Sequence, residues 1–389
     1  MSNLSSPRPQ ATAATVGVVA LVVAITVGGV WWVRHQDSGG DDPAAAASST
    51  SATDGRGRPD HSRSEPTHAP GTEDAPGTAG DRDLGNTAED LATGGPADPR
   101  VVVISVDGLG SQWVTRSTTP TIADLLDEGA GTLNARTEVE KTVTLPNHTG
   151  MVTGVRVDAA QGGHGVTWNH TSTRSVAPGT SSVFSTIYDA GGTSSVFAGK
   201  DKFEMWGRAW PGTIDPLDID EDQPALVDAA IGELRSGDDD LVFLHLAGPD
   251  SAGHAQGWGS PSYLDAVERA DADISRVVSA IGADDALAGE VVVIVTADHG
   301  GLPGRREHAD RTRPEDYTIP FVVWGPGIAH GDLYALNPDY RDPGTQQPGY
   351  DGAQPVRNGD VANVVTDLLG LDAVDGSQLD AAHDLDVAD

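Results

Sequence analysis

The stretch Val291–Gly300 reads VVVIVTADHG, and it decides the fold class of this chain. Its first six residues all have β-branched side chains, and apolar residues do not alternate with charged ones. A strand of this kind is covered by protein on both faces, as in a parallel sheet with helices on either side. The runs Val101–Val106 and Leu241–Leu246 are also largely apolar without alternation. These three segments predict buried strands.

Helical segments lie between these runs. Residues 119–129 begin with a Thr-Pro pair, which suits the N-cap and first position of a helix, and end with glycine. The segment Pro261–Ile281 carries apolar residues at helical spacing, and Pro224–Leu234 and Asp360–Leu369 are two further helix candidates. Strands that alternate with helices predict an α/β fold, with a mostly parallel sheet and helices on both faces.

The composition excludes several classes of function. Among 389 residues there are 24 Lys and Arg against 58 Asp and Glu, for a formal net charge of −34. Duplex nucleic acid is excluded as a partner, because binding it depends on neutralising phosphates with basic side chains. The absence of cysteine excludes disulfides, thiolate nucleophiles and cysteine-bound zinc. The sequence leaves the oligomeric state open.

An uncharged segment lies near the N-terminus. Ala11–Val33 contains no charged residue and exceeds the roughly 20 residues that span a bilayer core. Trp31 and Trp32, followed by Arg34, resemble an interfacial anchor at its end. A cleaved signal peptide and a buried core helix are the alternatives. Our interpretation is a signal anchor in the cell membrane that exports the rest of the chain.

The segment after the anchor is poor in large apolar side chains. Gln36–Asp98 contains two Leu but no Val, Ile, Phe, Tyr or Trp. Such a composition cannot offset the entropy cost of ordering, so we expect a disordered tether. The sequence therefore predicts three parts. These are a cytoplasmic stub with a transmembrane anchor in residues 1–35, a tether in residues 36–98, and a folded extracytoplasmic domain in residues 99–389.

An aspartate follows each predicted strand. Asp107 comes directly after the first run, Asp250 follows the second, and Asp298 follows the third. Ligands of open α/β sheets bind beyond the carboxyl ends of the strands, where these side chains are expected to meet. Three carboxylates at one place repel one another unless a cation lies between them. The pattern predicts a site for a polyvalent metal ion.

Two histidines extend this prediction. His254 lies four residues after Asp250, which is one helical turn, and His299 is adjacent to Asp298. Both pairs can therefore face one ion. Ligands with oxygen and nitrogen but no sulfur suit zinc, and also manganese or iron.

A candidate nucleophile stands at Thr144. It precedes a turn that contains Pro146 and a short apolar segment, which together indicate the start of a helix. A hydroxyl at this place lies near free backbone N–H groups and the positive end of the helix dipole, where phosphate is favoured. Coordination to a metal would lower its pKa and make it a nucleophile.

These residues, in this order, resemble the nucleotide pyrophosphatase/phosphodiesterase branch of the alkaline phosphatase superfamily. The resemblance covers roughly residues 100–371, so it implies an alkaline-phosphatase-like catalytic domain. It also implies that Thr144 attacks phosphorus to give a phosphothreonine, which water then hydrolyses. The motifs that carry it are Val106-Asp107-Gly108, Thr144-Leu-Pro-Asn-His148, Met151-Val-Thr-Gly154, His164-Gly165 with Asn169, Gly248-Pro-Asp250-Ser-Ala-Gly-His254, and Thr296-Ala-Asp298-His299-Gly300.

The resemblance implies two zinc ions held by carboxylates and imidazoles, and a phosphoryl contact from Asn169. The ligands of the first ion would be Asp107, Asp298, His299 and the Thr144 oxygen, and those of the second Asp250, His254 and a later histidine. We assign the later histidine to His308, because superfamily relatives often place it in the loop after the Asp-His-Gly turn.

Four other residues near these motifs receive no catalytic role. His148 and His164 match positions that are structural in the family, so they are left out of the metal shell. Lys200 and Lys202 flank Asp201, and either could contact a substrate phosphate. We favour a surface role for both.

The sequence thus predicts a zinc-dependent phosphoesterase that hydrolyses a phosphodiester or pyrophosphate bond in a small substrate. The alternative within the superfamily is a phosphomonoesterase, or a phospho-group transferase that acts on an envelope lipid or glycan. A sulfatase is disfavoured, because the Cys or Ser residue that sulfatases convert to formylglycine has no match at Thr144. An inactive, metal-stabilised binding module is a third class, and the complete set of ligands argues against it.

Overall fold

The computed structural model describes residues 99–389 of the chain. The predicted membrane anchor in residues 1–35 and the predicted tether in residues 36–98 lie outside the described residues. Within residues 99–389, no helix combines the length and the apolar character that crossing a membrane requires.

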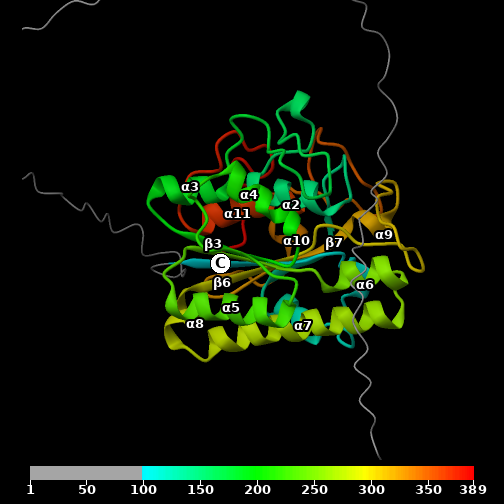
Figure 1. Ribbon diagram of the computed structural model, residues 1–389, viewed down its shortest axis with the longest axis horizontal. Helices are drawn as coiled ribbons and strands as arrows, with labels where there is room; N and C mark the ends of the chain where they lie inside the picture. Colours follow the sequence, from blue (N-terminus) through cyan, green and yellow to red (C-terminus); the bar gives the residue numbers. More distant parts are fainter. Residues whose placement is uncertain (1–98) are drawn as a thin grey trace, which may run out of the picture. The chain divides into compact units, whose positions relative to one another are not determined.

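An eight-stranded sheet forms the centre of the described residues (Figure 1). Its strand order is β4-β3-β5-β1-β6-β7-β2-β8. The strands are β1 (Arg100–Val106), β2 (Ala130–Arg136), β3 (Ser194–Ala198), β4 (Leu217–Ile219), β5 (Leu241–Leu246), β6 (Val291–Thr296), β7 (Thr318–Trp324) and β8 (Gly331–Asp332).

The three strands predicted from apolar runs are neighbours at the middle of this sheet. Strand β1 pairs in parallel with β5 on one side and with β6 on the other. All residues of β5 and β6 are buried, as expected for strands covered on both faces. Strand β7 is antiparallel to both β6 and β2, whereas β3 and β4 continue the parallel part. The prediction of a mostly parallel sheet is therefore confirmed.

Helices cover both faces of the sheet (Figure 1). One layer contains α5, α7 and α8, and α1 packs against α7. The opposite layer contains α2, α3, α4 and α11. The α-helices are α1 (Pro120–Glu128), α2 (Thr144–Thr153), α3 (Val183–Ala190), α4 (Glu204–Ala209), α5 (Gln223–Ser236), α6 (Gly248–Gln256), α7 (Pro261–Gly282), α8 (Asp285–Glu290), α9 (Pro314–Tyr317), α10 (Leu333–Leu336) and α11 (Val361–Leu368). Short 3-10 helices span Ser111–Trp113, Ala159–Gln161, Asp201–Phe203 and Asn358–Asp360.

Helix α7 illustrates why the local sequence produces these elements. The Ser260 hydroxyl accepts a hydrogen bond from the Tyr263 N–H, and Pro261 occupies the first turn. Its apolar stripe, which includes Val267 and Ile274, is buried against the rest of the domain. Truncating a side chain such as Ile274 to alanine would cost about 2–5 kcal/mol. This helix ends one residue beyond the predicted segment Pro261–Ile281.

Candidate active site

The three predicted aspartates meet beyond the carboxyl ends of the central strands. Asp107 directly follows β1, Asp250 lies in the first turn of α6 after β5, and Asp298 follows β6. Because β1 lies between β5 and β6, their loops converge at one edge of the sheet. The loops are in close contact. Gly108 has a φ of +78°, and a Cβ there would lie 2.9 Å from the Asp250 Cα.

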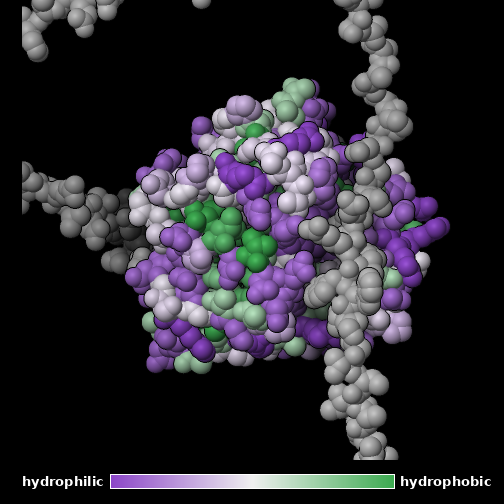
Figure 2. Space-filling view, viewed as in Figure 1, coloured by the Kyte–Doolittle hydropathy of each residue, from purple (hydrophilic) through white to green (hydrophobic). Residues whose placement is uncertain are grey.

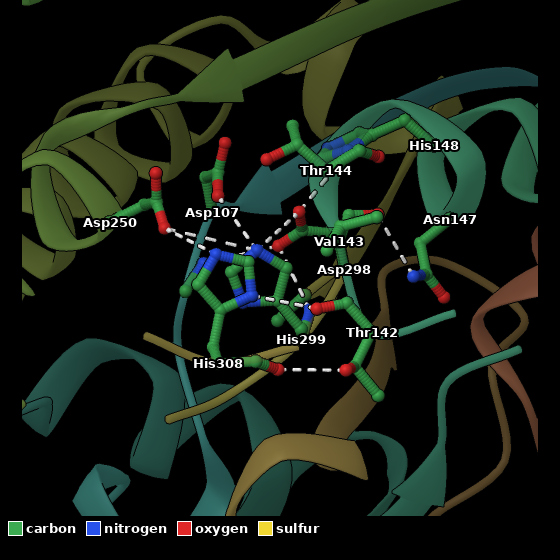
Figure 3. A network of polar contacts seen from close by, with 12 residues as sticks. Asp107, Thr142, Val143, Thr144, Asn147, His148, Asp250, Asp298, His299 and His308 are labelled. Atoms are coloured by element: carbon green, nitrogen blue, oxygen red, sulfur yellow. Dashed lines mark hydrogen bonds and ion pairs between the residues drawn. The ribbon is translucent and has the colours of Figure 1, made fainter. Parts of the chain in front are cut away.

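Asp107, Asp298 and His299 form one group of potential metal ligands. The His299 Nε2 lies 3.5 Å from the Asp107 Oδ1 and 3.2 Å from the Asp298 Oδ2. All three side chains are fully buried. Figure 3 shows Asp107 close to the adjacent pair Asp298 and His299.

A second group is formed by Asp250, His254 and His308. The Asp250 Oδ1 lies 3.4 Å from the His254 Nε2 and 3.6 Å from the His308 Nε2, and the two imidazole nitrogens are 3.2 Å apart. The structure therefore brings His308 to the place that the sequence assigns to it. His299 also lies near this group, with its Nε2 3.8 Å from the Asp250 Oδ1.

The three imidazoles are oriented by backbone carbonyl groups. The Nδ1 of His299 donates to the Gly300 carbonyl oxygen at 2.9 Å, and the Nδ1 of His308 donates to that of Thr142 at 2.7 Å. The Nδ1 of His254 donates to the Arg306 carbonyl oxygen at 2.8 Å. Because a carbonyl oxygen can only accept, Nδ1 carries the proton in each ring. Each ring therefore directs its Nε2, rather than its Nδ1, toward the place where a cation would be bound.

Unpaired buried atoms indicate that the site is built for cations. The Asp107 Oδ1, Asp250 Oδ1, Asp298 Oδ2 and His299 Nε2 have no hydrogen-bond partner among residues 99–389. Buried polar atoms in folded proteins are rarely left this way. All four belong to the two ligand groups, and oxygen and nitrogen donors suit zinc. The residues therefore fit two divalent cations.

The electrostatics of the buried groups agree with this fit. Burial raises the pKa of Asp298 well above its usual value, and the carboxylates of Asp107 and Asp250 raise it further. Burial alone would also raise the pKa of Asp107, but the Lys200 ammonium holds it well below the usual range. Burial lowers the pKa of His308 and of His299, so both rings are neutral, which is the form that binds metals.

Thr144 is the first residue of α2 and is almost fully buried. The residue before it, Val143, has no side chain that can cap the helix. The His148 Nδ1 donates to the Thr144 carbonyl oxygen at 2.9 Å, and its Nε2 lies 2.9 Å from the Ser105 hydroxyl oxygen. In Figure 3 Thr144 lies beside His148 at the edge of the carboxylate cluster. His148 thus holds the start of the helix against β1.

Asn169 reaches the same helix start from a loop. Its Oδ1 accepts hydrogen bonds from the Leu145 N–H at 2.9 Å and from the Lys202 Nζ at 3.2 Å. Because both partners are donors, the oxygen of the amide must be the atom that faces them. The Nδ2 group is consequently the donor end. His164 is buried nearby, and its Nδ1 accepts from the Val166 N–H at 3.1 Å.

Three residues at the site were not predicted from the sequence. The surface role favoured for Lys200 is wrong, because its Nζ lies 2.8 Å from the Asp107 Oδ2 and 2.5 Å from the Asp250 Oδ2. The same expectation fails for Lys202, which is buried. His245 lies inside β5, and its Nε2 lies 2.8 Å from the Asp107 Oδ2. A polar residue inside an apolar strand was the available signal for His245.

Comparison with known proteins identifies the family. The model of the type I phosphodiesterase / nucleotide pyrophosphatase family matches residues 101–185 and 164–354, which is more than half of the chain. The chain belongs to this family. Among solved structures, that of murine ectonucleotide pyrophosphatase / phosphodiesterase 5, in an inactive form with AMP, is similar with a TM-score of 0.54. It is 15% identical, and the match covers 71% of this chain and 96% of that one.

Other relatives show how diverse this superfamily is. A 2-O GAG sulfatase has the same fold with a TM-score of 0.52 and 14% identity, over 70% of this chain and 71% of that one. The GPI ethanolamine phosphate transferase 1 of Neurospora crassa is 29% identical over 153 residues, which are 36% of this chain and 14% of that protein. A 2,3-bisphosphoglycerate-independent phosphoglycerate mutase of Halobacterium salinarum is 30% identical over 150 residues, 38% and 25% of the two chains. The chain thus matches only a small part of these curated relatives. Family membership establishes an enzyme of the phosphoesterase and phosphotransferase superfamily, with the alkaline-phosphatase-like fold.

Proposed function

We propose that this protein hydrolyses a phosphodiester or pyrophosphate bond in a small substrate, with two zinc ions and a phosphothreonine intermediate on Thr144. The observation that carries the proposal is the pair of buried ligand groups whose unpaired atoms face one another. Three carboxylates and three imidazoles beyond the carboxyl ends of the central strands are the chemistry of a two-metal phosphoesterase. Membership of the phosphodiesterase family agrees with it.

The proposed ligands follow from the two groups. One ion would be held by Asp107, Asp298 and His299 together with the Thr144 oxygen, and the other by Asp250, His254 and His308. When bound, such ions act as Lewis acids that stabilise charge on the attacking and leaving oxygens. Each imidazole is already fixed with its Nε2 inward by a backbone carbonyl, so little reorganisation is needed.

The remaining residues position the phosphoryl group. The Thr144 hydroxyl releases its proton to solvent and its Oγ1 bonds to phosphorus. The leaving-group oxygen departs with the bonding electrons and takes up a proton from solvent. Water then attacks the phosphothreonine and frees Thr144. The Asn169 Nδ2 donates to a phosphoryl oxygen, because its Oδ1 is held by Leu145 and Lys202. The positive end of the α2 dipole, where Thr144 is the first residue, favours the negative charge of the phosphate.

A phospho-group transferase is the second candidate. It is favoured by the matches to GPI ethanolamine phosphate transferases of several organisms. In a transferase the hydroxyl of an acceptor, rather than water, would take the phospho group from Thr144. The predicted signal anchor would hold the catalytic domain at the outer face of the cell membrane, close to lipid or glycan acceptors. A phosphomonoesterase would use the same residues with a different leaving group.

The experiment that tests the proposal uses the purified full chain and nitrophenyl mono- and diesters. We expect hydrolysis of the diester, loss of activity after dialysis against a chelator, and recovery with zinc. Two zinc ions per chain should accompany full activity. Full activity of the metal-free protein would refute the proposal. Transfer of the phospho group to an added alcohol acceptor in excess of hydrolysis would favour the transferase instead.

A further inference from the structure

The carboxylates of Asp107 and Asp250 divide their two oxygens between different partners. The Oδ1 atoms of both are buried, have no hydrogen-bond partner among residues 99–389, and face imidazoles. They lie 3.5 Å from the His299 Nε2 and 3.6 Å from the His308 Nε2, respectively. The Oδ2 atoms of both contact Lys200, at 2.8 and 2.5 Å. One ammonium group therefore bridges two carboxylates and leaves their other oxygens free.

The backbone around Lys200 is fixed by the sheet. Lys200 comes two residues after the end of β3, which pairs with β5. The Gly199 N–H donates to the His245 Nδ1 at 3.2 Å, so the His245 Nε2–H donates to the Asp107 Oδ2. A Cβ on Gly199 would lie 2.9 Å from the Ala247 Cβ. The lysine is therefore held in place by close packing, and its side chain is only 14% exposed.

Lys200 is the cation that offsets the repulsion between the two carboxylates. A lysine side chain is an ammonium ion near neutral pH, and this one lies 2.8 Å from the Asp107 Oδ2 and 2.5 Å from the Asp250 Oδ2. Without a cation between them, two buried carboxylates that share this neighbour would repel each other strongly. A cation on both Oδ2 atoms reduces this repulsion and fixes the direction of both Oδ1 atoms.

The two carboxylates belong to different ligand groups. Asp107 lies in the group with Asp298 and His299, and Asp250 lies in the group with His308. We propose that Lys200 is a positioning residue that couples the two metal sites, by holding one carboxylate of each site so that its Oδ1 faces the ion. This inference rests on the proposed two-metal function, and it adds the link between the sites. Outer partners of metal ligands typically change metal affinity by about 10–100-fold.

The test is zinc affinity, measured by competition with a chelator, in the full chain with Lys200→Met. We expect the affinity of both zinc ions to fall by about 10-fold or more, because each site loses the group that orients its carboxylate. His308→Ala should lower the affinity for one ion only. The metal-free Lys200→Met protein should also unfold at a lower temperature than the metal-free wild type, because Asp107 and Asp250 lose their shared cation. Lys200→Arg keeps the charge and should retain more zinc affinity than Lys200→Met.

Comparing Lys202→Met with Lys200→Met distinguishes positioning of the carboxylates from contact with the substrate. The Lys202 Nζ donates to the Asn169 Oδ1, whereas the Lys200 Nζ bridges the two carboxylates. We therefore expect Lys202→Met to keep wild-type zinc affinity while turnover changes. Wild-type affinity for both ions in Lys200→Met, with reduced turnover, would overturn the inference and assign Lys200 to the substrate. A lower affinity for only one of the two ions in Lys200→Met would also overturn the proposed coupling. Lys200→Gln serves the same measurement if Lys200→Met does not fold. A wild type without bound zinc would instead overturn the proposed function.

Discussion

The imidazole ring of His308 stacks on that of His299, with ring centroids 3.6 Å apart and planes inclined by 8°. Each ring donates from Nδ1 to a backbone carbonyl oxygen, so both direct Nε2 toward the carboxylates. Two imidazolium rings could not stack in a buried place without strong repulsion, and burial lowers the pKa of both. The stack therefore holds two neutral ligands, one for each proposed ion.

His308→Ala should remove about one zinc ion per chain and lower turnover by about 10-fold or more, because it deletes a direct ligand. His330→Ala and His383→Ala are the controls. His330 is exposed, and the His383 Nε2 lies 3.0 Å from the Thr366 hydroxyl oxygen, away from the site. Metal analysis of the three variants checks the assignment. Two ions in His308→Ala and one ion in either control would reassign the ligand.

Thr144→Ala should abolish turnover while zinc content stays near that of the wild type. The expected loss is on the order of 10³-fold or more, because nucleophile and positioning are lost together. The ligands Asp107, Asp298 and His299 remain, so metal analysis serves as the control for site integrity. A variant that keeps a tenth of wild-type turnover would mean that water attacks phosphorus directly.

Gly108→Ala should destabilise the fold and disturb the site at once. Its φ of +78° strains any L residue, and the added Cβ would lie 2.9 Å from the Asp250 Cα. We expect a loss of about 1–3 kcal/mol in the free energy of unfolding, and weaker zinc binding. Gly179→Ala is the matched control, because its φ of +83° is similar but no atom lies within 4 Å of the added Cβ. Equal losses in the two variants, measured by urea unfolding, would show that backbone strain alone acts.

Glu138 should make the stability of the domain depend on pH. Its Oε2 and that of Glu140 both contact the Tyr350 hydroxyl. One hydroxyl proton cannot serve two carboxylates, so one carboxyl group must itself be protonated. Burial raises the pKa of Glu138 to about 7, which identifies it as the protonated one.

The direction of the pH dependence follows from the raised pKa of Glu138. The folded state binds a proton that the unfolded state releases, so the stabilisation is present below the unfolded pKa of about 4.5. As pH rises through about 7 this stabilisation is lost, and the free energy of unfolding falls by about 3 kcal/mol. Glu138→Gln should flatten this dependence in unfolding experiments between pH 4.5 and 8. Glu128→Gln, at an exposed site, should leave it unchanged. An unaltered slope in Glu138→Gln would contradict the assignment.

The orientation in the membrane remains a prediction from the sequence. Residues 1–9 should be cytoplasmic, and everything after Arg34 should be outside the cell. Protease added to intact cells should then cut the segment Gln36–Asp98 and release an active fragment. Cleavage that occurs only after lysis would reverse the orientation. A variant that lacks residues 1–35, and so stays in the cytoplasm, provides the control for protease specificity.

The sequence predicted those parts of the fold whose signal is local. Strands β1, β5 and β6 are recognisable because burial on both faces requires unbroken apolar runs. Strand β2, with the sequence AGTLNAR, was not predicted, because glycine and polar residues interrupt its few apolar ones. The antiparallel direction of β7 depends on how the chain returns to the sheet, which no local pattern encodes.

The same distinction explains what was predicted at the site. Asp107 and Asp298 could be placed because each follows a recognisable strand. Lys200 and His245 could not, because their contacts depend on the order β3-β5-β1, which brings three distant segments together. The contacts of Lys200 arise because β3, the strand before it, lies next to β5 in the sheet. His308 could be predicted because it lies in the loop that follows Asp298 and His299, so the chain needs only a short turn to bring it back to the site.

The pairing of β1 with strands far along the chain determines when the site can exist. Residues 100–106 are made early, but their neighbours are residues 241–246 and 291–296. During synthesis the first strand must therefore remain unpaired until most of the domain has emerged, and pairing over such separations is slow. Asp107 and Asp298 are brought together only when β1 pairs with β6. In the proposed two-metal enzyme, metal uptake would follow this pairing, and the relevant ion supply would be that of the compartment in which folding is completed.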